Sequence, residues 1–185
     1  GFSAAEVVYE GFTVAESKAA GYSAVELKAG GYSAQECKEA NISAREAGFS
    51  AAEVVYEGFT VAESKAAGYS AVELKAGGYS AQECKEANIS AKEAGFSAAE
   101  VKYEGFTVAE AKAAGYSAEE LKDGGFTAQE CKAANVSAMV AGFSAAELNY
   151  EGFMAEECTA LGYSAEELKE GGYSAQECKE ANISA

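Results

Sequence analysis

The strongest constraint on the fold is a ten-residue unit whose close variants fill the whole chain. The third copy reads Gly-Tyr-Ser-Ala-Val-Glu-Leu-Lys-Ala-Gly. Ser23 and Glu26 have the spacing of a capping box, and Tyr22 and Leu27 have the spacing of a hydrophobic staple. Gly31, which opens the next copy, suits the left-handed conformation that ends a helix. Each unit therefore predicts one very short helix with a defined start and a defined end.

A longer period is superimposed on the ten-residue one. Four ten-residue units are followed by a seven-residue unit, which first reads Asn-Ile-Ser-Ala-Arg-Glu-Ala, and then the cycle restarts. The resulting blocks are 1–47, 48–94, 95–141 and 142–185, which we treat as a single repeat array. Because the five units of a block keep separate identities, we expect five helices to form one superhelical turn, with equivalent positions of successive turns stacked on one another.

These periods predict an all-α fold, a solenoid of very short capped helices with about five helices (47 residues) per superhelical turn. The alternative is a β-helix like that of pentapeptide-repeat proteins, because large apolar residues also recur every five residues. We favour the helical fold, since 47 is not a multiple of five and a β-helix leaves the Ser/Thr-x-x-Glu pattern without a role. A Gly or Asn at the unit boundaries excludes long continuous helices.

The predicted core consists of the aromatic residue before each cap and the residue at the fourth helical position. The third unit of each block supplies one Tyr and one Leu, which we expect on the inside of the coil: Tyr22, Leu27, Tyr69, Leu74, Tyr116, Leu121, Tyr163 and Leu168. A further column consists of Tyr9, Tyr56, Tyr103 and Tyr150. We favour packing at a wider corner for this column, with an exposed aromatic stripe for side-to-side contact as the alternative.

All five cysteines occupy the staple position. Four of them are 47 residues apart and predict a ladder on one side of the coil: Cys37, Cys84, Cys131 and Cys178. Stacked helices hold their Cα atoms about 8–10 Å apart, which exceeds the roughly 7 Å limit for a disulfide. We therefore favour small buried apolar residues, with disulfides between neighbouring coils as the alternative. A metal site is not expected, because the chain has no C-x-x-C pair and no His.

The seven-residue units begin with Asn-x-Ser, which is also the acceptor pattern for N-glycosylation. The residues concerned are Asn41, Asn88, Asn135 and Asn182. Asn is the residue after Gly that best tolerates the left-handed conformation, and the Ser would cap the next helix. We favour this structural role over glycosylation.

Three apolar residues break the capping pattern. Met139 and Val140 replace the Arg/Lys-Glu pair of the earlier seven-residue units, and Met154 stands where Ser or Thr is expected. Each change should cost about 1 kcal/mol of local helix stability. We interpret the three as a candidate contact patch, with sequence drift as the alternative.

Composition limits the classes of partner. The chain carries 30 acidic and 14 basic residues, a formal net charge of −16, so nucleic acid and anionic membranes are not expected partners. No apolar run approaches the ~20 residues of a membrane span.

Catalysis is not expected, since there is no His and every candidate acid or base belongs to the repeat rather than to a unique cluster. No cofactor is implied.

The G-[FY]-[ST]-A-x-E-[LC]-K-x-[AG] unit resembles the decapeptide tandem repeats of large, uncharacterised proteins. The resemblance extends over all 185 residues, with departures at Met154 and Val140. It implies a short-helix solenoid and carries no activity.

The near-identity of the blocks favours a structural role. Blocks one and two differ only at Arg45 and Lys92, which gives a uniform surface rather than a specific epitope. Both ends lie within the repeat and neither has a divergent polar cap, which indicates a piece of something longer. We expect a segment or subunit of an extended fibre or stalk that stacks end to end with copies of itself. The alternative is a repeat scaffold that binds a protein partner; a fibre would favour an extracellular or cell-surface location.

Overall fold

The computed structural model describes residues 1–181, and the helices within them are all six or seven residues long. The described residues contain no β-strand, so the β-helix alternative is not supported. The expected fold, an all-α solenoid of short capped helices with a 47-residue repeat, is confirmed. The chain divides into two compact units, Gly1–Phe96 and Ser97–Ala185, and each unit is described by itself.

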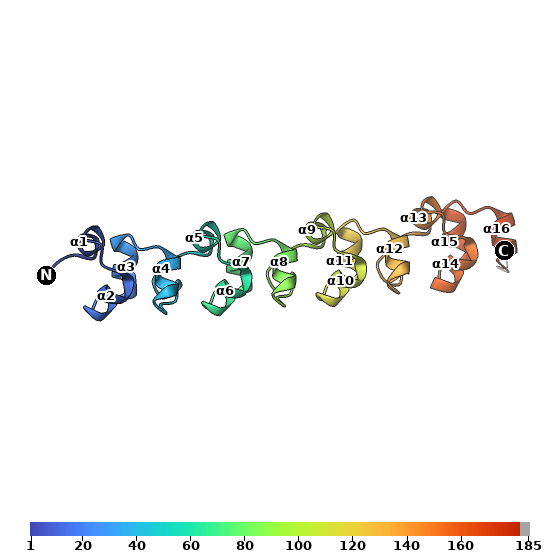
Figure 1. Cartoon of the computed structure of the whole chain (residues 1–185). Helices are drawn as coiled ribbons and strands as arrows, with labels where there is room; N and C mark the ends of the chain where they lie inside the picture. Colours follow the sequence, from blue (N-terminus) through green and yellow to red (C-terminus); the bar gives the residue numbers. More distant parts are fainter. Residues whose placement is uncertain (182–185) are drawn as a thin grey trace. The chain divides into compact units, whose positions relative to one another are not determined.

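The first unit contains eight helices, drawn from blue to green in Figure 1. They are α1 (Ala4–Tyr9), α2 (Val14–Ala19), α3 (Ala24–Gly30), α4 (Ala34–Glu39), α5 (Ala51–Tyr56), α6 (Val61–Ala66), α7 (Ala71–Gly77) and α8 (Ala81–Glu86). The described part of the second unit repeats this order. Its helices are α9 (Ala98–Tyr103), α10 (Val108–Ala113), α11 (Ala118–Asp123), α12 (Ala128–Ala133), α13 (Ala145–Tyr150), α14 (Ala155–Leu161), α15 (Ala165–Glu170) and α16 (Ala175–Glu180).

The helices begin at the predicted capping boxes. At α3, the Ser23 N–H donates to Glu26 Oε2 at 2.8 Å, and the Glu26 N–H donates to Ser23 Oγ at 3.3 Å. The same reciprocal pair starts the other helices with a Ser or Thr cap. Each box supplies acceptors for backbone N–H groups that a six-residue helix cannot satisfy internally.

The helices end where a residue adopts positive φ. At the end of α3, Gly31 has φ 109°, its N–H donates to Lys28 O, and the Tyr32 N–H donates to Leu27 O at 3.2 Å. This backbone pattern turns the chain sharply and satisfies two of the last carbonyl groups. Gly costs little at such a φ because it lacks a Cβ.

The seven-residue unit departs from the expectation of five helices per block. After Ser43, the chain makes one α-type turn, in which the Ala47 N–H donates to Ser43 O at 3.0 Å and the Phe49 N–H donates to Ala44 O at 2.9 Å. Only Ala44–Ala47 separate this cap from the positive-φ Gly48. A block of 47 residues therefore consists of four helices and one capped turn.

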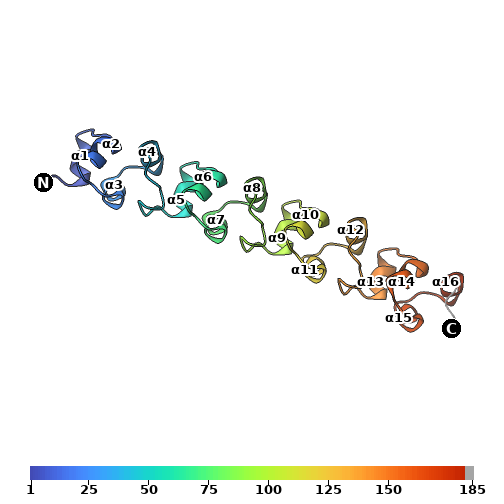
Figure 2. The same cartoon turned by 90° about the horizontal axis from the view of Figure 1, so that it is seen from below.

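Direct contacts correct the expected stacking of equivalent positions. Within the first unit, the hydrogen bonds that join successive turns of the solenoid involve side chains. They connect residues that are 15 to 28 positions apart in the sequence. In both views of this unit, other helices lie between α4 and α8 (Figures 1 and 2). The 47-residue block is thus the period of the structure, but the chain meets itself again after about half a block.

A close backbone contact in each block joins its first and third helices. A Cβ built on Gly30 of α3 would lie 2.8 Å from both the Cβ and the carbonyl carbon of Ala4 in α1. Gly77 and Ala51 repeat this contact between α7 and α5. The final Gly of the third unit is therefore required by close approach of two backbones, which any larger side chain would prevent.

The core is built from the predicted staple residues. The leucines of the third units are fully buried at 0–1% exposure, namely Leu27, Leu74, Leu121 and Leu168. Of the tyrosines before their caps, Tyr69, Tyr116 and Tyr163 are buried, whereas Tyr22 is half-buried. Tyr69, the repeat equivalent of Tyr22, is covered by Arg45 of the preceding block, whose guanidinium lies 5.5 Å from the centre of the ring.

Candidate interaction surfaces

The boundary between successive blocks is a contact between lysines and aromatic rings. Lys28 of the first block reaches into the second, where its Nζ donates to Gly48 O at 2.8 Å and lies 2.9 Å from the Glu53 carboxylate. The same Nζ stands 4.5 Å from the centre of the Phe49 ring. One lysine therefore combines a hydrogen bond, an ion pair and a cation–π contact.

A second lysine and a glutamine extend this boundary. Lys38 forms an ion pair with Glu63 and lies 4.9 Å above the Phe59 ring. The Gln35 N–H donates to the Glu57 carboxylate at 3.0 Å, and Gln35 Nε2 donates to Glu57 O at 3.3 Å. The boundary is thus held at several points by one block's basic and amide groups and the next block's acidic groups.

The equivalent boundary inside the second unit has the same chemistry. Lys122 Nζ donates to Gly142 O at 2.6 Å, lies 2.9 Å from the Glu147 carboxylate and 4.9 Å above the Phe143 ring. Lys132 pairs with Glu157 over Phe153, and Gln129 bonds Glu151. Two independent boundaries therefore show the same set of contacts.

Helix caps and cations of the preceding block together lower the pKa of the carboxylates at the boundary. The pKa of Glu53 falls to about 2, through the Ser50 backbone N–H first and Lys28 second. The pKa of Glu63 also falls to about 2, with Lys38 as the largest cause and the Thr60 cap second. Arg45 is the largest cause of the low pKa, about 2, of Glu73. Each carboxylate is ionised at neutral pH and caps its helix while it binds a cation of the preceding block.

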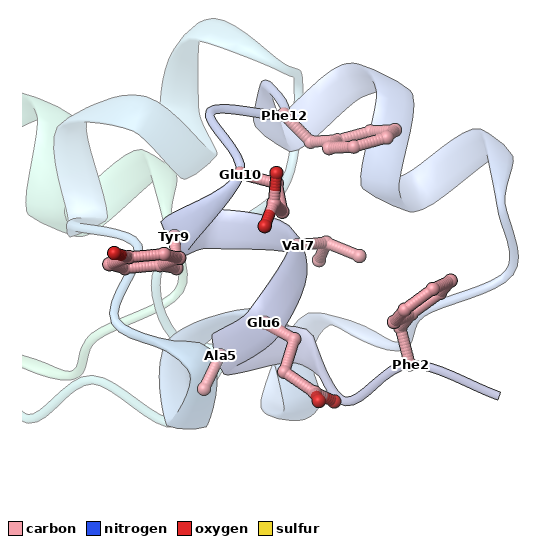
Figure 3. A pocket seen from close by; sticks show the side chains of 7 residues that line it. All are labelled: Phe2, Ala5, Glu6, Val7, Tyr9, Glu10 and Phe12. Carbon is pink, nitrogen blue, oxygen red and sulfur yellow. The ribbon is translucent and has the colours of Figure 1, made fainter.

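The N-terminal face exposes the aromatic residues that this boundary covers elsewhere. Phe2 is 75% exposed, whereas its repeat equivalent Phe49 is 8% exposed; Phe12 is 48% exposed, against 5% for Phe59. A cavity of about 720 Å³ opens here, lined by Phe2, Ala5, Glu6, Val7, Tyr9, Glu10 and Phe12. Figure 3 shows Phe2, Val7 and Phe12 on one side of α1 and Tyr9 pointing the other way.

The C-terminal face shows the complementary change. Ala175 and Lys169 are exposed and Cys178 is half-buried, whereas their equivalents Ala34, Lys28 and Cys37 are buried, half-buried and buried. Gln176, the equivalent of Gln35, has turned to Glu180 within its own helix, with its Nε2 2.7 Å from Glu180 Oε1. Within the described residues, these groups face solvent or one another.

The column of tyrosines on the first helix of each block is exposed. Tyr9 is 89% exposed, and Tyr56, Tyr103 and Tyr150 are 93–94% exposed. The favoured interpretation of this column, packing at a wider corner, is therefore wrong. The side chains stand at the last residue of six-residue helices and point away from the staple face, so no neighbouring unit reaches them.

The cysteines belong mostly to the core. Cys37, Cys84, Cys131 and Cys158 are buried, and Cys178 is half-buried. Burial raises the pKa of the Cys37, Cys131 and Cys158 thiols, because it disfavours the thiolate. All five lie within the described residues and none is in a disulfide. Cys37 and Cys84 occupy equivalent positions of the repeat. They do not stack directly on one another, as the predicted cysteine ladder required.

The Asn residues that open the seven-residue units adopt the left-handed conformation. Asn41, Asn88 and Asn135 have φ values of 54°, 53° and 52°, the positive values of a helix stop. This geometry accounts for Asn at these positions, and all three side chains are exposed. Asn182 lies outside the described residues.

The candidate contact patch is exposed, with Met139 at 40%, Val140 at 67% and Met154 at 71%. Met139 occupies the position of Arg45, and its Sδ lies 3.1 Å from a Cβ built on Gly162, as the Arg45 stem lies against Gly68. Met139 thus keeps the packing of the arginine stem without its charge. Met154 gives no side-chain cap to α14, although its N–H still donates to Glu157 at 2.8 Å.

The described residues contain no group of three or more His, Cys, Asp or Glu side chains placed to hold a metal ion. No described helix has the length and apolar character that a membrane span requires.

Sequence reasoning missed the lysines and the third-unit glycines. Lys28 and Lys38 had no assigned role in the predicted fold, yet they hold the block boundary. The signal that could have found them is their constant phase, since Lys recurs at the eighth position of most units. The Gly at the end of a helical segment, where Ala would be the better helix former, marks the close approach to Ala4.

Comparison with known proteins agrees with the repeat structure. The family model described as "Decapeptide repeat region" matches residues 1–47, 43–94, 90–141 and 137–185. No curated protein and no solved structure matches the chain. Because these matches cover the whole sequence in four tandem copies, the chain belongs to the decapeptide repeat region family.

Proposed function

We propose that the chain is a non-catalytic structural repeat protein, a segment or subunit of an extended fibre, filament or stalk that assembles by end-to-end stacking. The observation that carries this proposal is the contrast between identical residues in blocks one and two. Phe2 and Phe12 are exposed where Phe49 and Phe59 are covered by the preceding block. Residues 1–12 have the same sequence as residues 48–59, which meet the preceding block at the internal boundary. The N-terminal face therefore presents the same residues that receive a block inside the chain.

End-to-end stacking of two copies is favoured because it buries the exposed apolar surface. The contacts it uses are of the kinds found at the internal block boundaries. Removing the rings of Phe2 and Phe12 from water contributes to association in proportion to the area covered, at about 25 cal/mol per Å². The exposed rings are surrounded by carboxylates that a preceding block's lysines neutralise at the internal boundaries. The net charge of −16 opposes association over longer distances.

The test is sedimentation velocity of the 185-residue chain over a wide range of concentration. We expect the wild-type chain to form species that grow with concentration, and Phe2→Ser with Phe12→Ser to weaken this growth. Tyr9→Ser is the matched control, because its repeat equivalent Tyr56 stays 93% exposed beside a covering block. A wild-type chain that sediments as a monomer at every concentration would contradict the proposal.

The second candidate is a repeat scaffold that binds a protein partner. The observation in its favour is the column of tyrosines with 89–94% exposure, one on the first helix of each block. Exposed tyrosines are frequent anchors of protein interfaces. A monomeric wild-type chain in the sedimentation experiment would leave this candidate as the better one.

A further inference from the structure

We propose that the C-terminal face of one copy docks on the N-terminal face of a second copy in the register of the internal block boundary. This inference rests on the proposed function, which supplies the partner, and it adds the residue pairs that meet. The two internal boundaries, at Lys28–Gly48 and Lys122–Gly142, serve as templates.

The first pair follows from the 47-residue period. Lys169 is the fourth-block equivalent of Lys28, and Gly1, Phe2 and Glu6 are the first-block equivalents of Gly48, Phe49 and Glu53. In the proposed register, Lys169 donates to the Gly1 carbonyl of the second copy, pairs with its Glu6 carboxylate and covers its Phe2 ring. Each of these roles is performed by Lys28 inside the chain.

Two further pairs follow in the same way. Lys179 corresponds to Lys38, so it meets Glu16 and Phe12 of the second copy. Gln176 corresponds to Gln35, so it leaves Glu180 and binds Glu10 of the second copy.

The groups on both faces are available in the isolated chain. Lys169 and Lys179 are exposed on α15 and α16. The Glu6 and Glu16 carboxylates accept hydrogen bonds from their own caps, at 2.7 and 2.8 Å, as Glu53 accepts one from Ser50 while it binds Lys28. A cap and a lysine of a second copy can therefore share one carboxylate.

Charge favours head-to-tail contact over contact between two N-terminal faces. The N-terminal face presents Glu6, Glu10 and Glu16, and the C-terminal face presents Lys169 and Lys179 together with Glu180. Two N-terminal faces would bring carboxylates together, which is unfavourable, whereas a head-to-tail contact sets these carboxylates against the two lysines. A head-to-tail contact uses different surfaces on the two copies, so it propagates instead of closing into a dimer.

The test uses two charge reversals, Lys169→Glu and Glu6→Lys, in sedimentation experiments on the full chain. Each variant alone should associate roughly tenfold more weakly than wild type, or worse, because a cation–π contact or an ion pair becomes a repulsion. An equimolar mixture should recover association. In the mixture, the reversed C-terminal face of one variant meets the reversed N-terminal face of the other, and the two introduced charges have opposite signs.

Matched controls separate the register from general effects of charge and capping. Lys18→Glu makes the same charge change, but its equivalent Lys65 donates within its own block, to Ala87 O and Asn88 O. Glu36→Lys removes the same kind of capping carboxylate, and its repeat equivalent Glu83 bonds its own cap, Ser80, within its block. Both controls should associate as wild type does.

A second readout follows Cys178. Its equivalent Cys37 is buried under the following block, so association should slow the reaction of Cys178 with a thiol reagent. If wild type associates while both reversals associate equally well and Cys178 stays reactive, the register is wrong and end-to-end stacking stands. A wild-type chain that stays monomeric overturns both.

Discussion

At the scale of single residues, one buried contact of the core has either two polar partners or none. Ser17 Oγ lies 2.8 Å from Tyr32 OH, and Ser64 repeats this bond with Tyr79 at 2.7 Å. In the third block both hydroxyl groups are absent, because the equivalent residues are Ala111 and Phe126. In the fourth block Cys158 Sγ lies 3.1 Å from Tyr173 OH. The core therefore keeps both partners of the polar pair or replaces both.

This pairing predicts non-additive effects on stability. Tyr79→Phe alone leaves the buried Ser64 hydroxyl without its partner and should destabilise the chain by about 1–3 kcal/mol. Adding Ser64→Ala should recover the part of this loss that comes from the Ser64 hydroxyl, since the third block carries the same Ala–Phe pair, whereas the bond from Tyr79 OH to Phe59 O stays lost. Urea unfolding of the two single variants and the double variant measures the coupling; strictly additive losses would contradict the account.

The carboxylates at the block boundary predict a loss of stability in acid. The pKa values of Glu53, Glu63 and Glu73 lie at about 2 in the folded chain, against their usual value of 4.5. A lowered folded pKa means that the unfolded chain binds protons first, so the stabilisation present above pH 4.5 is lost as pH falls toward about 2. Thermal unfolding followed by circular dichroism should show the midpoint falling through this window.

The matched variant for this experiment is Lys38→Met, which removes the largest cause of the low pKa of Glu63. Its midpoint should depend less on pH between 4.5 and about 2 than that of wild type. Equal pH dependence in the two chains would show that the ion pair does not contribute.

Local chemistry was the most predictable part at this scale. The capping boxes, the glycine stops and the left-handed Asn41 follow from preferences that act within a few residues. The close approach of Gly30 to Ala4 could not be predicted, because it depends on which helices meet in space. The exposure of Tyr56 was missed for the same reason.

At the scale of elements, helices of six or seven residues depend on their ends. Isolated helices shorter than about 12–15 residues are marginal in water, since nucleation is costly. Here the caps satisfy the first N–H groups, and staple residues such as Leu27 are buried completely. The helix is therefore stable only as part of the array.

The defective cap of α14 gives an element-scale prediction. Met154→Thr should stabilise the chain by about 1 kcal/mol, because Thr supplies the side-chain acceptor that Thr60 gives to α6. Met154→Ala is the control, since it removes the exposed apolar side chain without adding a cap. Urea unfolding midpoints compare the three chains; equal stability of the Thr and Ala variants would contradict the capping account.

The seven-residue unit marks where element prediction failed. Its Ser43 and Glu46 have the capping-box spacing, so the pattern predicts a fifth helix. Only one turn fits between the cap and Gly48, and that turn carries three backbone hydrogen bonds instead of a helical ladder. A local motif specifies how a helix starts but not whether enough residues follow.

At the scale of the whole molecule, the sequence period and the contact distance differ. The 47-residue period is real, but it reflects the order of five distinct units rather than the distance between touching chains. The contacts between residues 15–28 positions apart depend on how far side chains such as Lys28 and Tyr32 reach, which no periodicity reveals. The same contacts are the template for the proposed docking of a second copy on the N-terminal face.

The central claim is that copies of the chain stack end to end, and negative-stain electron microscopy tests it most directly. At high concentration the wild-type chain should form linear particles much longer than one chain, and the double variant Phe2→Ser/Phe12→Ser should form far fewer of them. Dilution should shorten the particles, because each junction is an independent equilibrium. A field of discrete particles of one size at every concentration would contradict the account.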